Sequence, residues 1–344
     1  METVGNLNLA IIAASIGLRF ASIIMNLILA YKYWVSEFYA FSAWTVGSIV
    51  VSMVITSLIY IHIFSSKASI SIQKRILDQG VFLNVVLAYL FRDGYAFYYT
   101  RKLKNIKEAG DREGEIILYQ KLISEECNVG FIRLFDSFLE SAPQKILQLV
   151  IVLWSMNDLS YFRLATFVVY FSSIAWGIQS YNRSNRLVQF DKRDIESKGR
   201  LIQFAFLLCL TTSRTLCIAC LASLFPKATL VVCAAHVFVC VCIIFAVDSP
   251  TIADSRLMNC LYCACFGIVY LFIFTSVKDT PTKYKYVFYL SFCSFENIVA
   301  CVLFFSLHIS IFIIALYIFG IVLIIIYYWT CHPSISLSTF PFTL

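Results

Sequence analysis

Long apolar blocks separated by short polar stretches run through the whole of this 344-residue chain. A helix needs roughly 20 apolar residues to cross the hydrocarbon core of a bilayer. Only 14% of the residues are charged, whereas soluble domains average about 25%. The blocks are continuous rather than alternating between apolar and polar residues, which argues against a β-barrel. We therefore predict an all-α polytopic membrane protein, with ten candidate segments: 7–31, 40–64, 80–99, 130–153, 161–181, 201–224, 228–247, 257–275, 285–306 and 308–330.

The basic residues predict which connections face the cytoplasm, because cytoplasmic loops are enriched in Lys and Arg. The polar stretches 100–128 and 182–200 each contain six basic residues. The stretch 65–79 is also basic, with Lys67, Lys74 and Arg75. If all ten segments crossed the membrane, 65–79 and 100–128 would lie on opposite faces. If 80–99 instead enters and returns on the same side, both stretches are cytoplasmic. The same parity argument makes segment 257–275 re-entrant.

The resulting prediction is eight transmembrane helices plus two re-entrant helical hairpins, arranged in two similar halves. Residues 1–181 would form two spans, the re-entrant segment 80–99 and two further spans. Residues 182–344 would form a cytoplasmic loop, two spans, the re-entrant segment 257–275, two spans and a short tail. Duplicated architectures of this kind are common in transporters. Both termini are expected in the cytoplasm.

The densest group of polar residues inside an apolar segment is F-I-R-L-F-D-S-F-L-E-S-A-P-Q-K-I-L-Q, at positions 131–148. Arg133, Asp136 and Glu140 recur at intervals of three and four residues, so a helix places them on one face. Gln144 continues that face, and Pro143 should kink the helix at the preceding turn because it lacks a backbone donor. Charged groups inside the membrane usually face a protein interior or a water-filled path. The stripe could form a polar path, or hold helices together by ion pairs, and the two roles are compatible.

Two further charges lie near the middle of apolar segments. Arg214 lies in segment 201–224 and Glu296 in segment 285–306. Arg214 needs a partner there, and either Glu140 or Glu296 could supply it. Such a pair could be purely structural or could contact lipid head groups. We predict that Glu140 and Arg214 serve one polar pathway.

No sequence pattern here indicates catalysis, nucleic-acid binding or a cofactor. The chain has no Walker loop, no HExxH and no G-x-S-x-G motif. Cys260 and Cys263 form a C-x-x-C, but they lie in an apolar stretch without a nearby histidine, which argues against zinc. Four histidines are scattered singly, as core or interfacial residues usually are. We expect neither an enzyme nor a metal site.

The segment 131–148 resembles the signature of the XK-related family of phospholipid scramblases, in which an E-S-x-P-Q element follows an L-R-x-F-E-x-F-like approach. Three further stretches are similar in order and spacing to family elements. They are S-S-I-A-W-G-I-Q-S-Y-N-R-S-N-R (172–186), L-I-Q-F-A-F-L-L-C-L-T-T-S-R (201–214) and I-I-I-Y-Y-W-T-C-H-P (324–333). The resemblance covers nearly the whole chain.

The resemblance implies eight spans, two re-entrant segments and lipid scrambling that needs no ATP and no cofactor. Carried over by position, it implies an intramembrane charged set of Asp136, Glu140, Arg214 and Glu296, completed by Pro143 and Gln144. It also implies a plasma-membrane protein that exposes phosphatidylserine on dying cells, in some cases with a single-span membrane partner. The alternative is a membrane adaptor or transporter subunit that does not scramble lipid.

The chain departs from the family pattern at two places. The family often has acidic residues in the first spanning helix, whereas this region has Arg19 and Asn26 and no carboxylate. The soluble tails are short, and neither contains a D-x-x-D site for caspase cleavage. Activation by cleavage of a tail is therefore not expected for the chain as given.

Overall fold

The computed structural model describes residues 6–67, 94–155, 161–189, 194–248, 255–276, 283–304 and 306–332. Within these ranges every regular element is a helix, which confirms the all-α prediction. The α-helices are α1 (Asn6–Val35), α2 (Tyr39–Lys67), α5 (Gly94–Ala109), α6 (Arg112–Asp136), α7 (Ala142–Ser155), α8 (Tyr161–Leu187), α9 (Ser197–Leu224), α10 (Pro226–Ile243), α11 (Arg256–Tyr270), α12 (Lys283–Phe304) and α13 (Leu307–Thr330). Two π-helical turns, η1 (Ser137–Ser141) and η2 (Ile244–Asp248), directly continue α6 and α10.

Five helical stretches of the described chain are long and apolar enough to cross a membrane: Tyr39–His62, Ser197–Leu224, Pro226–Val247, Tyr284–Phe304 and Leu307–Thr330. These helices expose large apolar side chains. On the outer side of α13, for example, Ile311, Phe312, Ile318 and Phe319 are each 54–56% exposed. Soluble monomers rarely expose contiguous apolar surface on this scale. The chain is therefore a multi-pass membrane protein, while the number of eight spans with two hairpins stays a prediction.

The stretch 100–128, expected as a polar connection, is mostly helical. Helices α5 and α6 form a hairpin around the turn at Gly110, whose φ of 75° suits glycine. Asp111 then caps α6 by accepting a hydrogen bond from the backbone N–H of Gly114 at 3.0 Å. Apolar side chains of the two helices, Leu103, Leu118 and Leu122, bury a small core of their own.

Helix α9 lies at the centre of the second half of the chain and contacts α7, α8, α10, α12 and α13. Glycine permits two of the closest approaches. A Cβ atom on Gly320 of α13 would lie 2.9 Å from the Leu210 side chain of α9. A Cβ atom on Gly267 of α11 would lie 2.6 Å from Cγ2 of Val241 on α10. Larger residues at these positions would force the helices apart.

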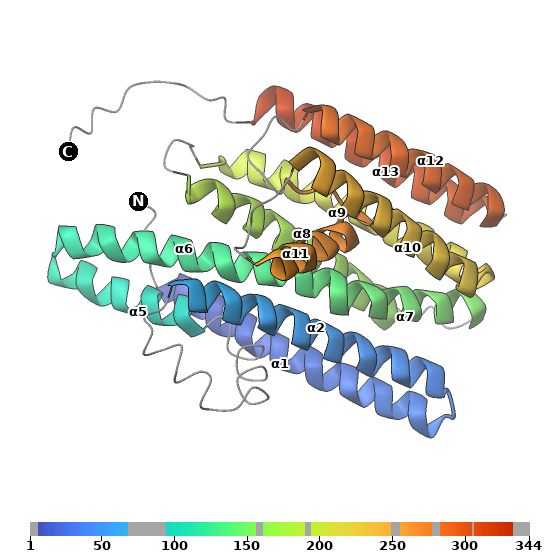
Figure 1. The fold of residues 1–344 in the computed structure, drawn as a ribbon, viewed down its shortest axis with the longest axis horizontal. Helices are drawn as coiled ribbons and strands as arrows, with labels where there is room; N and C mark the ends of the chain where they lie inside the picture. Colours follow the sequence, from blue (N-terminus) through green and yellow to red (C-terminus); the bar gives the residue numbers. More distant parts are fainter. Residues whose placement is uncertain are drawn as a thin grey trace.

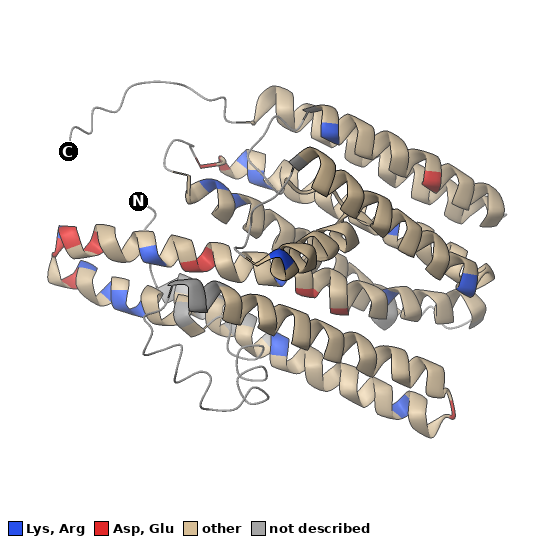
Figure 2. Cartoon of the chain, in the orientation of Figure 1, with Lys and Arg blue, Asp and Glu red and all other residues tan. Residues whose placement is uncertain are grey.

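The two ends of the bundle differ in their charge. The tip of the α5–α6 hairpin and the connection between α8 and α9 lie at the left end in Figure 1, and Figure 2 shows many of the charged residues there. The turns between α1 and α2, between α9 and α10 and between α12 and α13 lie at the right end. The described parts of the stretches 100–128 and 182–200 thus lie at the same end of the molecule.

Helix α11 is too short to cross a bilayer. Its 15 residues span about 22 Å, whereas the hydrocarbon core is about 30 Å thick. Residues 271–275 follow it without regular structure and are buried. Helix α10 ends and α12 begins at the same end of the bundle (Figure 1), so the α11 segment does not connect opposite ends. Most of the other expected hairpin, 80–99, lies outside the described residues, and residues 94–99 form the start of α5.

Candidate functional site: two buried charge clusters

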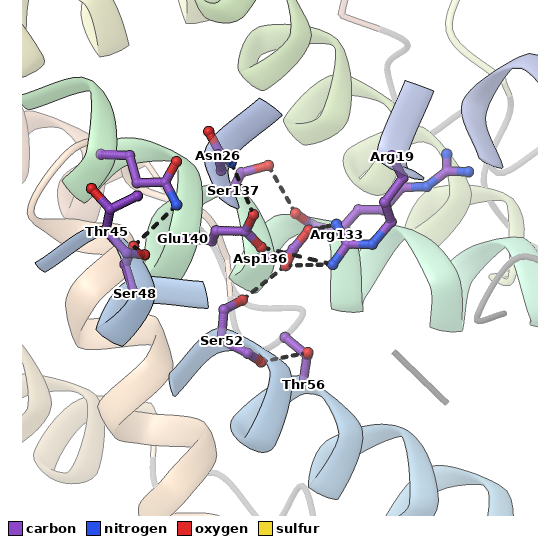
Figure 3. Close-up of polar contacts among 11 residues, drawn as sticks. Arg19, Asn26, Thr45, Ser48, Ser52, Thr56, Arg133, Asp136, Ser137 and Glu140 are labelled. Atoms are coloured by element: carbon purple, nitrogen blue, oxygen red, sulfur yellow. Dashed lines mark hydrogen bonds and ion pairs between the residues drawn. The ribbon is translucent and has the colours of Figure 1, made fainter. Parts of the chain in front are cut away.

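The first cluster joins α1 to the helix that runs from α6 into η1 (Figure 3). Both terminal nitrogens of Arg19 bond the carboxylate of Asp136, Nη2 at 3.0 Å from Oδ1. The same Nη2 lies 3.8 Å from Oε2 of Glu140. Asp136 and Glu140 are only 5% and 2% exposed. We call Arg19, Asp136 and Glu140 the first cluster.

Uncharged side chains add hydrogen bonds to the first cluster and beside it. Ser52 of α2 donates to Asp136 Oδ1 at 2.8 Å. Asn26 of α1 donates to Glu140 Oε1 at 3.5 Å. One turn further along, Gln144 Nε2 donates to Ser48 Oγ at 3.1 Å. Ion pairs buried in a low dielectric stabilise a fold only when such bonds satisfy their remaining lone pairs.

Helix α2 presents a row of hydroxyl groups to this cluster. The hydroxyl stripe consists of Ser42, Thr45, Ser48, Ser52 and Thr56, which recur every three or four residues and extend along about 21 Å of helix. Thr45 and Thr56 donate to carbonyls four residues earlier, at 2.9 and 2.6 Å. A hydroxyl that donates to its own helix keeps lone pairs that can accept from another group. All five recur at helical spacing, a signal that was visible in the sequence.

A local change of helix geometry precedes Pro143. The helix changes from α to π geometry over Ser137–Ser141, directly before it, and the N–H of Ala142 donates to the carbonyl of Ser137. Single π turns of this kind recur at functional sites. The carbonyl of Pro143 accepts a hydrogen bond from Trp44 Nε1 of α2 at 3.1 Å. The distorted turn therefore contains Glu140 and is fastened to α2.

The second cluster lies between α9, α10, α12 and the end of α11. Arg214 Nη2 donates to Glu296 Oε2 at 2.7 Å, and its Nη1 donates to Asn297 Oδ1 at 2.8 Å. Glu296 Oε1 is 2.8 Å from Nδ1 of His236 on α10. Arg214 and His236 are 2% and 3% exposed. We call Arg214, His236 and Glu296 the second cluster.

Arg214 and His236 also contact backbone carbonyls where α11 ends. Arg214 Nε donates to the carbonyl of Leu271 at 3.2 Å, and His236 Nε2 lies 3.2 Å from the carbonyl of Tyr270. A helix that ends inside a membrane leaves carbonyls without an intrahelical partner, and each is expensive in hydrocarbon. The second cluster therefore supplies hydrogen-bond partners to a short helix that ends inside the protein.

An aromatic zone lies between the two clusters. Phe138 of η1 stacks on Phe272, with ring centroids 5.1 Å apart, and Phe135 of α6 meets Phe266 of α11 at 5.2 Å. Phe272 follows directly after the residue whose carbonyl Arg214 binds. The end of α11 thus contacts the π turn of the first cluster on one side and the charges of the second cluster on the other.

The structure decides between the two partners considered for Arg214. Arg214 pairs with Glu296, and Glu140 lies beside Arg19. The two members of the predicted single pathway therefore belong to different clusters. Arg133 lies one turn before Asp136, and its carbonyl accepts a bond from Ser137.

The sequence indicated no partner for Arg19 or for His236. The structure pairs Arg19 with Asp136 and places His236 beside Glu296. Lys145, one residue after Gln144, donates to Gln148 Oε1 at 2.8 Å and lies over the ring of Tyr170. Arg92 and Asp93 lie outside the described residues. Among the residues that the structure describes, no three His, Cys, Asp or Glu side chains are grouped to hold a metal ion.

A model of the XK-related protein family matches residues 10–333. The chain belongs to the XK-related family. This confirms the resemblance inferred from the motifs.

Two relatives in this family carry the name Cell death abnormality protein 8. The one from Caenorhabditis briggsae is 24% identical over 286 residues, which cover 76% of this chain and 61% of the relative. The one from Caenorhabditis elegans is 22% identical over 265 residues, which cover 72% and 57%. This chain therefore matches less than two thirds of the length of each relative.

Proposed function

We propose that this chain is a phospholipid scramblase, which lets lipids, phosphatidylserine included, move between leaflets without ATP. The observation that carries the proposal is the polar seam formed by the first cluster and the hydroxyl stripe. It extends for about 21 Å along α2, in a bilayer whose hydrocarbon core is about 30 Å thick. Membership of the XK-related family and relatives named for abnormal cell death support the proposal.

The seam would act by lowering the desolvation energy of a lipid head group. Moving a charged or polar group through hydrocarbon without hydrogen bonds is strongly unfavourable. A guanidinium such as that of Arg19 matches a phosphate, and the carboxylates of Asp136 and Glu140 match an amine. The acyl tails would stay in the bilayer, so the lipid gradient alone would drive the flux. Here the first helix supplies a cation to the seam, whereas many family members have an acid there.

The rival proposal is a membrane adaptor or transporter subunit that does not scramble lipid. In that case both clusters would only hold helices together, which buried ion pairs can also do. A secondary transporter of small solutes is a third candidate, because paired hairpins suit that class too. A scramblase differs from the other two candidates because the purified chain moves lipid by itself.

The test is the flux of a fluorescent phospholipid in proteoliposomes that contain the full chain. We expect flux in the wild type without ATP, and about ten-fold or greater loss per folded molecule in Glu140→Gln and Asp136→Asn, since a charge-assisted bond contributes about 1.5–3 kcal/mol. Glu113→Gln is the matched control, because Glu113 is exposed on α6. Absence of flux in the wild type would support the rival. Equal flux in all four proteins would mean that the first cluster is only structural.

We further propose that the protein lies in the plasma membrane with both termini in the cytoplasm, and that its function includes lipid exposure in dying cells. The presence of both basic stretches at one end of the bundle supports this orientation. A single-span membrane protein is the kind of partner that the family resemblance suggests. Selective permeabilisation with epitope tags at the two termini tests the orientation.

A further inference from the structure

The imidazole of His236 lies between two hydrogen-bond acceptors. Its Nδ1 is 2.8 Å from Glu296 Oε1, and its Nε2 is 3.2 Å from the backbone carbonyl oxygen of Tyr270. The residue is 3% exposed, and its ring packs on that of Phe292 with centroids 5.2 Å apart. Water therefore has little access to either nitrogen.

A neutral imidazole has one N–H and one bare nitrogen. A carbonyl oxygen and a carboxylate that pairs with Arg214 are both acceptors. A neutral ring would therefore place a bare nitrogen against an oxygen, at one end or the other. Only the imidazolium donates to both acceptors, so the geometry points to two protons on this ring.

We propose that His236 is a positioning residue, doubly protonated in the folded protein, which as an imidazolium ties the end of α11 to α10 and α12. This goes beyond the proposed function, because it concerns how α11 is held and can be tested whether or not the chain moves lipid. The alternative is a purely structural role, in which His236 is a neutral core histidine that makes a single hydrogen bond.

The charges around the ring are compatible with a cation. Glu296 carries one negative charge between two cations, and the C-terminal end of α11 adds a partial negative charge of roughly one half. Among the described residues, the other titratable groups near the ring or the cluster are thiols and phenols: Cys217 on α9, Cys233 and Cys240 on α10, Tyr270 on α11, Tyr289 and Cys293 on α12, and Tyr317 on α13.

The cluster has a mechanical consequence for the fold. Arg214 binds the carbonyl of Leu271, and His236 binds that of Tyr270. When His236 loses one proton, one of its two contacts is lost and Arg214 alone fastens the end of α11. Losing that proton should therefore loosen α11 while leaving the Arg214–Glu296 pair in place.

The direct test is nitrogen NMR of the full chain in lipid, with ¹⁵N-labelled histidine, at pH 7.5. The chain has four histidines, and we expect one ring with both nitrogens protonated. That signal should vanish in His236→Gln and persist in His308→Gln, the matched control, because His308 is exposed. A spectrum in which His236→Gln removes a ring with one bare nitrogen would overturn the proposal.

The second test is the pH profile of thermal stability, measured as the melting midpoint. We expect the wild-type midpoint to fall by roughly 3 °C between pH 6.5 and 8.0, below the range in which free thiols and phenols ionise, with the same fall in His308→Gln and a much smaller one in His236→Gln. A wild-type slope that persists in His236→Gln would overturn the proposal. Should His236→Gln fail to fold, Glu296→Gln replaces it: the doubly protonated signal must then be lost at a lower pH than in the wild type, and an unchanged titration would contradict the assignment.

Discussion

The pairing of Arg214 with Glu296, and not with Glu140, makes a quantitative prediction for a double-mutant cycle. The perturbations are Arg214→Gln, Glu296→Gln and Glu140→Gln, singly and in the two double combinations with Arg214→Gln. Residues in one ion-pair network show coupling of about 0.5–3 kcal/mol, whereas distant residues are additive within about 0.5 kcal/mol. The structure places Arg214 Nη2 2.7 Å from Glu296 Oε2, and it places Glu140 beside Arg19.

The contacts of each residue set the expected sizes. Arg214→Gln removes bonds to Glu296, Asn297 and the Leu271 carbonyl, and it leaves a carboxylate with His236 alone. Breaking a buried pair from one side typically destabilises by about 3–5 kcal/mol. Glu296 has a side chain that is 21% exposed, so Glu296→Gln should cost less, about 1–3 kcal/mol. The double variant should then lose less than the sum, by about 1–3 kcal/mol.

The assay is the melting midpoint of detergent-purified protein, together with the amount of folded protein recovered. The double variant of Arg214→Gln and Glu140→Gln is an internal control. It makes the same Glu→Gln change as the double variant with Glu296→Gln, and Glu140 is as buried as Arg214, at 2% exposed each. We expect coupling with Glu296→Gln and additivity with Glu140→Gln. Coupling with Glu140→Gln and additivity with Glu296→Gln would refute the pairing and restore the single-pathway interpretation.

Three other predictions follow from particular contacts. Gly267→Val should separate α10 from α11 and lower the melting midpoint by several degrees, while Gly17→Val, where a Cβ meets nothing within 4 Å, should not. The sequon at Asn182 should carry no glycan in expressing cells, because 182–200 is predicted to be cytoplasmic; glycosylation there would contradict the topology. Burial would raise the pKa of Asp194, but its hydrogen bonds with Arg183 and the charge of that residue hold the pKa below its usual value. The pair should therefore stabilise the protein at neutral pH and lose its effect as the pH falls below about 4, and Arg183→Gln should cost less than about 1 kcal/mol, because Asp194 is partly exposed.

The apolar blocks predicted the bounds of several helices closely, because the thickness of the bilayer sets how many apolar residues a spanning helix needs. Segment 308–330 corresponds to Leu307–Thr330, and segment 40–64 to Tyr39–Lys67. The polar stretch 100–128 was harder, since its helices are stabilised by a small local core and not by hydropathy. The stretches 100–128 and 182–200 lie at one end of the bundle, while their cytoplasmic orientation and the re-entrant segment 80–99 stay predictions.

The candidate site was only partly predictable, because partner choice depends on which helices meet. The spacing of Arg133, Asp136 and Glu140 identified one polar face from local periodicity. It could not reveal that Arg19, more than a hundred residues earlier, provides the cation. His236 carried no local signal, because it is an isolated histidine in an apolar helix. Only the fold shows that it lies beside Glu296. The hydroxyl stripe did carry a signal, because its residues recur every three or four positions. That signal is easily overlooked, since apolar helices tolerate Ser and Thr.

Burial constrains how the proposed path could work. The carboxylates of the first cluster are at most 5% exposed, so a head group cannot reach them while α2 remains in contact with α7 and η1. Among the described residues, the side-chain bonds that hold that seam include Ser52 to Asp136, Gln144 to Ser48, and Trp44 to the Pro143 carbonyl. Each contributes about 0.5–1.5 kcal/mol net, and somewhat more where a carboxylate accepts. A head group that offers its own phosphate oxygens and amine can replace such bonds as it passes. If lipid uses this seam, opening it therefore requires a few kcal/mol and no external energy source, which is what passive scrambling needs.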